Sequence, residues 1–152
     1  MGEYKRSTRE CSLEDMHPEL KAAIGEHVER YGLEDVVALA IYCCETVSIR
    51  EKKKIFGSKT EVEISGAILS PKWLIWAGGK ENGAVGVFSA RLQELRVQDY
   101  ENTKMYKMIA DTGLDVYGFP TGEGPASVFI GLGPEPAAQK FREMLKDAMA
   151  EA

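Results

Sequence analysis

Apolar residues recur at helical spacing near both ends of the chain. The first stripe consists of Leu20, Ile24, Val28 and Tyr31. The second stripe consists of Ala137, Phe141, Met144, Leu145, Ala148 and Met149. Each stripe forms one face of an amphipathic helix, and a proline stands near the start of each segment, where its missing N–H costs nothing. The pattern therefore predicts helices over 18–31, where Gly32 suits the left-handed end, and over 134–152.

Between these helices apolar and polar residues alternate, which is typical of strands that are buried on one face. The predicted strands are 36–50, 60–69, 73–77, 84–89, 92–100, 114–119 and 126–132. Segments rich in Gly, Pro, Ser and Asn lie between several of them and favour tight turns. Because the strands are short neighbours joined by such turns, we expect them to pair antiparallel.

Three segments are less uniform. Residues 1–17 are expected to form a flexible arm, because the charges at their start are mixed and follow no apolar period. Segment 34–42 is rich in strand formers, yet Glu34 and Asp35 could open a helix there. Segment 102–112 has apolar residues at helical spacing before a glycine, so a short helix is preferred and a strand is the alternative.

The fold class follows from the order of these elements. A chain of 152 residues with 44% hydrophobic and 28% charged residues has the size and composition of one globular domain. Strands and helices do not alternate, which argues against a parallel doubly wound sheet. We predict a mostly β fold: an antiparallel seven-stranded barrel or sandwich over 36–132, capped by the helix 134–152 and preceded by the extra helix 18–31.

This layout resembles that of pleckstrin-homology-like (PH-like) domains, including their bacterial PH and GRAM-type relatives. The likeness lies in the hairpin of 60–69 and 73–77, in the fifth strand around 92–97, and in the helix 134–152, within a region that covers about 36–152. In PH domains that bind phosphoinositides, the loop between the first two strands supplies basic residues. The resemblance therefore implies an anion-binding role for residues 50–59.

The charge of the chain is concentrated at that loop. The net charge is −5, but residues 50–59 hold five basic residues and one acid, which leaves −9 for the rest. The candidate anion-binding or lipid-binding residues are Arg50, Lys52, Lys53, Lys54 and Lys59. Ile55 and Phe56 are candidates for insertion into a membrane surface or for contact with a partner. Against this, Glu61 and Glu63 lie where phosphate would bind, and a solvated basic hairpin that guards a sheet edge has the same composition.

The sequence contains no constellation typical of catalysis or metal binding. Cys11, Cys43 and Cys44 are expected to be buried free thiols in a reducing compartment. His17 and His27 lie ten residues apart, without a nucleophile motif beside them and without the spacing of a metal-binding pair. We expect no catalytic residue, no metal site and no cofactor.

The sequence therefore favours a binding module, not an enzyme, that contacts a protein partner or a second copy of itself. Trp73 and Trp76 lie on opposite faces of one strand, so one belongs in the core and the other, if exposed, would contact a partner. One alternative is weak binding of anionic phospholipid or phosphate through residues 50–59. Another is a small-ligand enzyme or carrier that uses the barrel interior.

Nucleic acid is not an expected partner, because the chain is acidic overall and its aromatic residues are not interleaved with basic ones. The polar N-terminus lacks the apolar core of a signal peptide, and no apolar run approaches the ~18–20 residues of a membrane span. A cytoplasmic location is therefore expected.

Overall fold

The computed structural model describes residues 4–152, apart from the side chains of residues 52–54 and 58. The strands are β1 (Lys5–Glu10), β2 (Tyr42–Lys54), β3 (Gly57–Leu69), β4 (Trp73–Lys80), β5 (Val85–Arg91), β6 (Arg96–Asp99), β7 (Gly113–Thr121) and β8 (Gly124–Gly131). The α-helices are α1 (Pro18–Tyr31), α2 (Glu34–Ala38) and α3 (Pro136–Glu151). The 3₁₀ turns are η1 (Leu13–Asp15), η2 (Leu92–Glu94), η3 (Tyr100–Asn102) and η4 (Lys104–Lys107).

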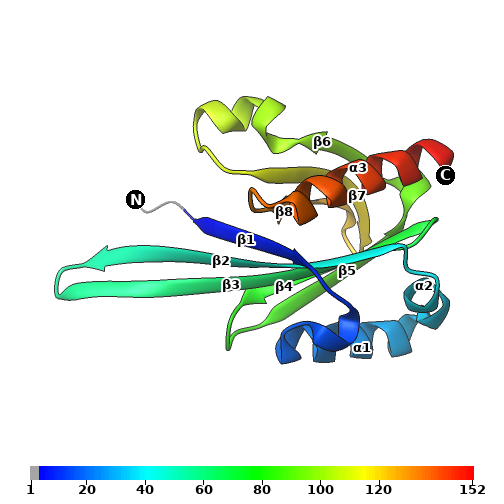
Figure 1. The fold of residues 1–152 in the computed structure, drawn as a ribbon, viewed down its shortest axis with the longest axis horizontal. Helices are drawn as coiled ribbons and strands as arrows, with labels where there is room; N and C mark the ends of the chain where they lie inside the picture. The colour runs from blue at the N-terminus through cyan, green and yellow to red at the C-terminus, as the bar shows by residue number, and fades with distance from the viewer. Residues whose placement is uncertain (1–3) are drawn as a thin grey trace.

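The strands form two antiparallel sheets, so the prediction of a mostly β, antiparallel fold with a C-terminal helix is confirmed. The first sheet has the order β1-β2-β3-β4-β5 and the second the order β6-β7-β8. Figure 1 shows α1 below the five-stranded sheet, and α3 with the three-stranded sheet above it. Strand pairing among the described residues does not close into a barrel, and the molecule is a layered sandwich.

Each face of the five-stranded sheet covers its own hydrophobic core. The core toward the second sheet and α3 includes Leu74, Leu114, Phe119, Phe141 and Leu145. The core toward α1 includes Leu20, Ile24, Ile64, Ile68 and Ile75. Trp73 and Trp76 are each half-buried and pack against different cores, as the two-residue period of a strand requires. Neither indole is therefore a fully exposed contact residue.

The two helices predicted from apolar stripes are confirmed. α1 begins at Pro18, and the Nδ1 atom of His17 accepts a hydrogen bond from the Glu19 amide at 3.1 Å. The helix ends at Gly32, whose φ of 65° lies in the left-handed region that glycine adopts without strain. α3 buries Ala138, Phe141, Leu145 and Ala148 against the first core.

The prediction of a flexible arm over 1–17 is wrong, because β1 lies within it and pairs with β2. The inward positions of β1 are polar, so no apolar alternation marks the strand in the sequence. Arg6 donates to both carboxylate oxygens of Asp111, with Nε at 2.8 Å and Nη2 at 2.7 Å. Thr8 Oγ1 lies 2.8 Å from Thr46 Oγ1. Satisfied polar groups thus take the place of apolar ones on this strand.

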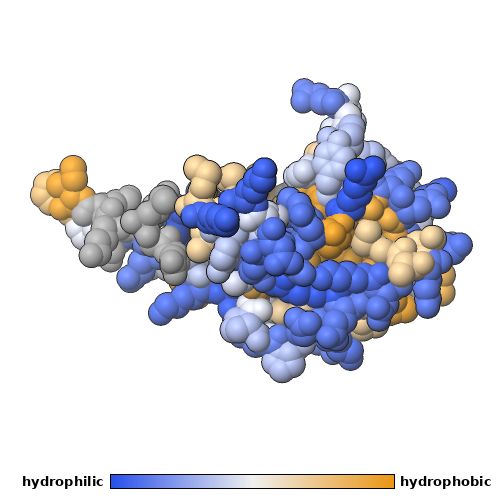
Figure 2. All heavy atoms as spheres, turned by 90° about the horizontal axis from the view of Figure 1, so that it is seen from above, coloured by the Kyte–Doolittle hydropathy of each residue, from blue (hydrophilic) through white to orange (hydrophobic). Residues whose placement is uncertain are grey.

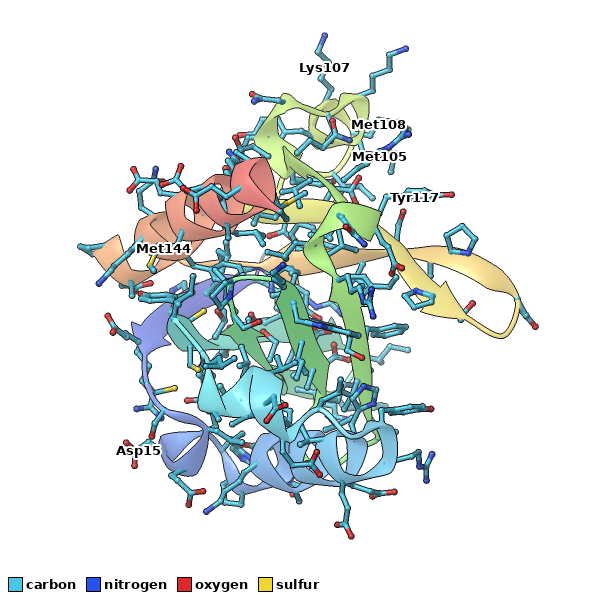
Figure 3. The ribbon with its side chains drawn as sticks, turned by 90° about the vertical axis from the view of Figure 1, so that its right-hand side faces the viewer. Asp15, Met105, Lys107, Met108, Tyr117 and Met144 are labelled. Carbon is cyan, nitrogen blue, oxygen red and sulfur yellow. The ribbon has the colours of Figure 1, made fainter. Side chains whose placement is uncertain are left out.

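The other differences between prediction and structure concern the residues at which helices or turns end and strands begin. The start of the predicted strand 36–50 belongs to α2, which confirms the helical alternative at Glu34, and β2 itself runs to Lys54. The predicted strand 92–100 consists of the turn η2 followed by β6. Segment 102–112 holds η4 instead of a continuous helix, because its apolar residues have no core to cover, and Figure 3 shows Lys107 pointing away from the body. With β1 included, the sheets contain eight strands over residues 4–152, instead of the predicted seven.

Candidate functional site

The β2–β3 hairpin extends beyond the rest of the sheet. β2 and β3 pair without interruption from Tyr42↔Leu69 to Lys54↔Gly57. β1 pairs with β2 only up to Ile49, and β4 pairs with β3 only from Glu63 onward. Residues 50–61, called the distal hairpin below, therefore have no further strand on either side among residues 4–152. Figure 1 shows this two-stranded ribbon projecting to the left of the body.

The turn of the distal hairpin is apolar and almost fully exposed. Ile55 and Phe56 form the turn, and they are 94% and 96% exposed. Gly57 follows with a φ of 94°, a conformation that L side chains rarely adopt. Figure 2 shows the hydrophobic tip at the far left end of the molecule. Two neighbouring large apolar side chains that fold without burial point to a contact outside the chain.

Basic residues occupy both strands next to this tip. The register places Lys52 directly opposite Lys59, and Lys54 opposite Gly57. Lys59 is exposed, whereas the side chains of Lys52, Lys53 and Lys54 lie outside the described ones. Like charges at directly opposite positions destabilise an antiparallel pair. The sequence and the register therefore concentrate positive charge next to the tip.

The base of the distal hairpin is already neutralised. Nη2 of Arg50 donates to Oε2 of Glu61 at 2.7 Å, and this hydrogen bond is the main reason why the pKa of Arg50 is raised. The hydroxyl of Tyr4 donates to Glu63 at 2.7 Å, and burial, followed by this bond, raises the pKa of Tyr4 to about 12. The charge of Arg50 is therefore paired within the fold.

A polar cleft of about 700 Å³ lies between β1, η3 and α3. Nη1 of Arg142 donates to Asp99 at 2.8 Å, and Nη2 lies 3.0 Å from Glu101. Lys146 donates to the other Asp99 oxygen at 2.8 Å, and this bond, with those from Arg142, lowers the pKa of Asp99. These four charged groups neutralise one another, and the network fastens α3 to the end of β6 and to η3.

A second cleft of about 630 Å³, called the β5 cleft, lies at the edge strand β5. Its lining residues are His27, Tyr31, Leu33, Trp73, Val87, Phe88, Ser89, Pro120, Thr121 and Gly122. Figure 3 shows β5 between α1 below and the β7–β8 hairpin above. Nε2 of His27 lies 2.8 Å from Ser89 Oγ. Sequence reasoning missed this pair, because 62 residues separate its members and no motif connects them.

The two hydrophobic cores fill the interior between the layers, and both of these clefts lie at the surface. Within the described part of the chain, no group of three or more His, Cys, Asp or Glu side chains could hold a metal ion. The three cysteines are free, and only Cys44 is fully buried. None of the described helices has the length and apolar character that crossing a membrane requires.

Comparisons with known proteins add no relative. No family model, no curated protein and no solved structure matches this chain.

Proposed function

We propose that this chain is a non-catalytic, PH-like binding module that docks on anionic phospholipid surfaces through the distal hairpin. The observation that carries the proposal is the tip, where Ile55 and Phe56 are almost fully exposed. Lysines flank the tip in both strands. An apolar tip with basic flanks suits a membrane surface, because the apolar side chains can enter the headgroup region while the lysines meet anionic lipids.

The order of elements supports the PH-like part of the proposal. Four strands (β2–β5), then three strands (β6–β8), then the helix α3 follow one another along the chain. β1, α1 and α2 are additions to this plan. The β2–β3 hairpin joins the first two strands of the plan, which is the place where phosphoinositide-binding PH domains carry their basic residues.

The contact is with the membrane surface as a whole, not with a single headgroup held in a pocket. A headgroup pocket needs basic side chains at the base of the hairpin, where Arg50 is instead paired with Glu61. The four lysines lie toward the tip. Each lysine near an anionic surface contributes about 1 kcal/mol, so the four lysines contribute up to about 4 kcal/mol at low salt. The projection of the ribbon also separates them from the acidic body.

A protein partner or a second copy of the chain, the first expectation from the sequence, would use the same tip and the ribbon edges, which pair with no other strand of the described residues. Lipid is the better fit because basic residues flank the apolar pair on both strands. A groove on a protein would match only one particular arrangement of these residues. An anionic bilayer accepts them in any arrangement.

Vesicle sedimentation tests the proposal. Wild-type protein should sediment with vesicles that contain about 30% phosphatidylserine at low salt, and an ionic strength near 0.5 M should release it. Lys52→Gln, Lys53→Gln and Lys54→Gln together should reduce binding about 100-fold, which corresponds to the loss of about 3 kcal/mol. The matched control neutralises Lys21, Lys72 and Lys140, which are exposed lysines on other elements. Equal losses in both triple variants, or no sedimentation of the wild type, would overturn the proposal.

A further inference from the structure

The β5 cleft has mostly apolar walls and one hydrogen-bonded pair of polar side chains. Its aromatic residues are Tyr31, Trp73 and Phe88. A cleft of this size, with mostly apolar walls and a few polar atoms, is typical of small-molecule sites. Aromatic side chains offer flat surfaces against which a planar ring can stack. The shape and the walls therefore favour a small, flat, largely apolar ligand.

The polar group is the hydrogen-bonded pair of His27 and Ser89. Burial, and to a lesser degree the charge of Arg30, lowers the pKa of His27, so the imidazole is neutral at pH 7. When neutral His27 donates through Nε2 to Ser89 Oγ, the serine hydroxyl remains free to donate to a ligand. The ring centroids of His27 and Tyr31 lie 4.6 Å apart, so the imidazole also packs against the tyrosine ring.

A cation lies on the same strand face as this hydroxyl. Arg91 follows Ser89 by two residues in β5, so both side chains lie on the same face of the sheet. The Arg91 guanidinium lies over the Trp73 ring, 5.7 Å from its centroid, and has no carboxylate partner among the described residues. By contrast, Arg30 in the last turn of α1 is paired with Glu26 of the same helix at 3.3 Å. Arg91 does not itself line the cleft, but its guanidinium lies at the margin of the cleft, against the Trp73 ring that does line it.

We propose that the β5 cleft binds a small planar aromatic carboxylate. Its ring packs against Trp73, and its carboxylate accepts hydrogen bonds from Ser89 in the cleft wall and from Arg91 at the cleft margin. A guanidinium and a hydroxyl together match a carboxylate, and the bond to a charged donor is the stronger of the two. The cleft lies at the β5 edge, away from the distal hairpin, so this site does not depend on membrane docking.

The probe is 2-naphthoate, with its neutral counterpart 2-naphthalenemethanol as the comparison. Calorimetry should give a dissociation constant below about 1 mM for 2-naphthoate, and at least tenfold weaker binding of the alcohol. In ¹H–¹⁵N spectra the Trp73 indole and the Ser89 amide should shift, with Trp76→Phe used only to assign the indole signals. Ser89→Ala and Arg91→Gln should each weaken binding at least about fivefold. Arg96→Gln, an exposed arginine in β6, should leave it unchanged.

Three results would overturn the inference: no heat and no shift up to about 5 mM probe, equal affinity for acid and alcohol, or an affinity that Arg91→Gln leaves unchanged. Failure here is distinguishable from failure of the proposed function. Vesicle sedimentation of Arg91→Gln reports on the hairpin alone, and it should match that of the wild type.

Discussion

Replacing Ile55 and Phe56 with serine separates the function of the distal hairpin from its stability. The two side chains make almost no contact in the fold, since they are 94% and 96% exposed. Their replacement should therefore change the free energy of unfolding by less than about 0.5 kcal/mol, as for most surface substitutions. A large loss of stability would show instead that the tip packs against the body.

The expected effect on membrane binding is much larger. Full burial of an isoleucine or a phenylalanine stabilises by about 1.5–3 kcal/mol. A tip that enters only the headgroup region gains roughly half of this per side chain. The pair should then contribute about 1.5–3 kcal/mol, and its loss should weaken binding roughly 10- to 100-fold. Because this part of the affinity is apolar, it should persist at high salt, unlike the contribution of the lysines.

The assay is sedimentation with anionic vesicles, and denaturant unfolding checks stability in parallel. The matched control is the double variant Met108→Ser and Ile109→Ser, which removes two exposed apolar side chains beside η4. The control should bind as the wild type does. If the hairpin variant keeps full affinity, or if the control loses as much, the tip is not the docking element.

Three further predictions concern the fold. Gly118→Ala should lower the free energy of unfolding by at least about 2 kcal/mol, because φ is 116° and the new Cβ would clash with the carbonyl oxygen of Glu94. Gly122→Ala, with open space around it, is the neutral control in the same denaturant titration. Asp111→Asn should cost about 3 kcal/mol by the same measurement, since it leaves the charge of Arg6, whose side chain is 7% exposed, without its partner; a cost below about 1 kcal/mol would contradict this. Burial raises the pKa of all three thiols, and only Cys44 is also fully buried, so Cys44 should react with a disulfide reagent at least about tenfold more slowly than the other two in native protein, and at a similar rate after unfolding.

Much of the fold could be predicted from the sequence because it rests on local signals. Helix α1 can be predicted from its apolar residues at helical spacing, because the helix buries one face on the sheet. Pro18 and Gly32 mark its ends. The distal hairpin could be predicted from its charge, although the pairing of Arg50 with Glu61 could not. That pair connects residues on two strands, and its formation depends on the register.

What the sequence did not reveal depends on contacts between distant segments. β1 carries Arg6 at an inward position, and Asp111, which neutralises it, lies 105 residues away. A strand whose buried face is polar has no alternation to detect. The His27–Ser89 pair is hidden for the same reason, because each residue is unremarkable until the helix packs against β5.

The distal hairpin departs from the usual rules of protein stability more than the rest of the fold does, and this departure bears on function. Arg6 is largely buried, yet it is hydrogen-bonded to Asp111, as a stable fold requires. In the distal hairpin, by contrast, Lys52 stands opposite Lys59, and Ile55 and Phe56 face solvent. Departures of this kind are expected at residues that serve function instead of stability.

A solvated ribbon that guards a sheet edge would explain the lysines of the distal hairpin, because charge on an unpaired edge discourages aggregation. It would not explain the tip, since an exposed Ile–Phe pair promotes the association that the lysines discourage. Docking on an anionic surface accounts for both features with one contact. The tip therefore distinguishes the two interpretations, and serine at residues 55 and 56 is a more decisive test than neutral residues in place of the lysines.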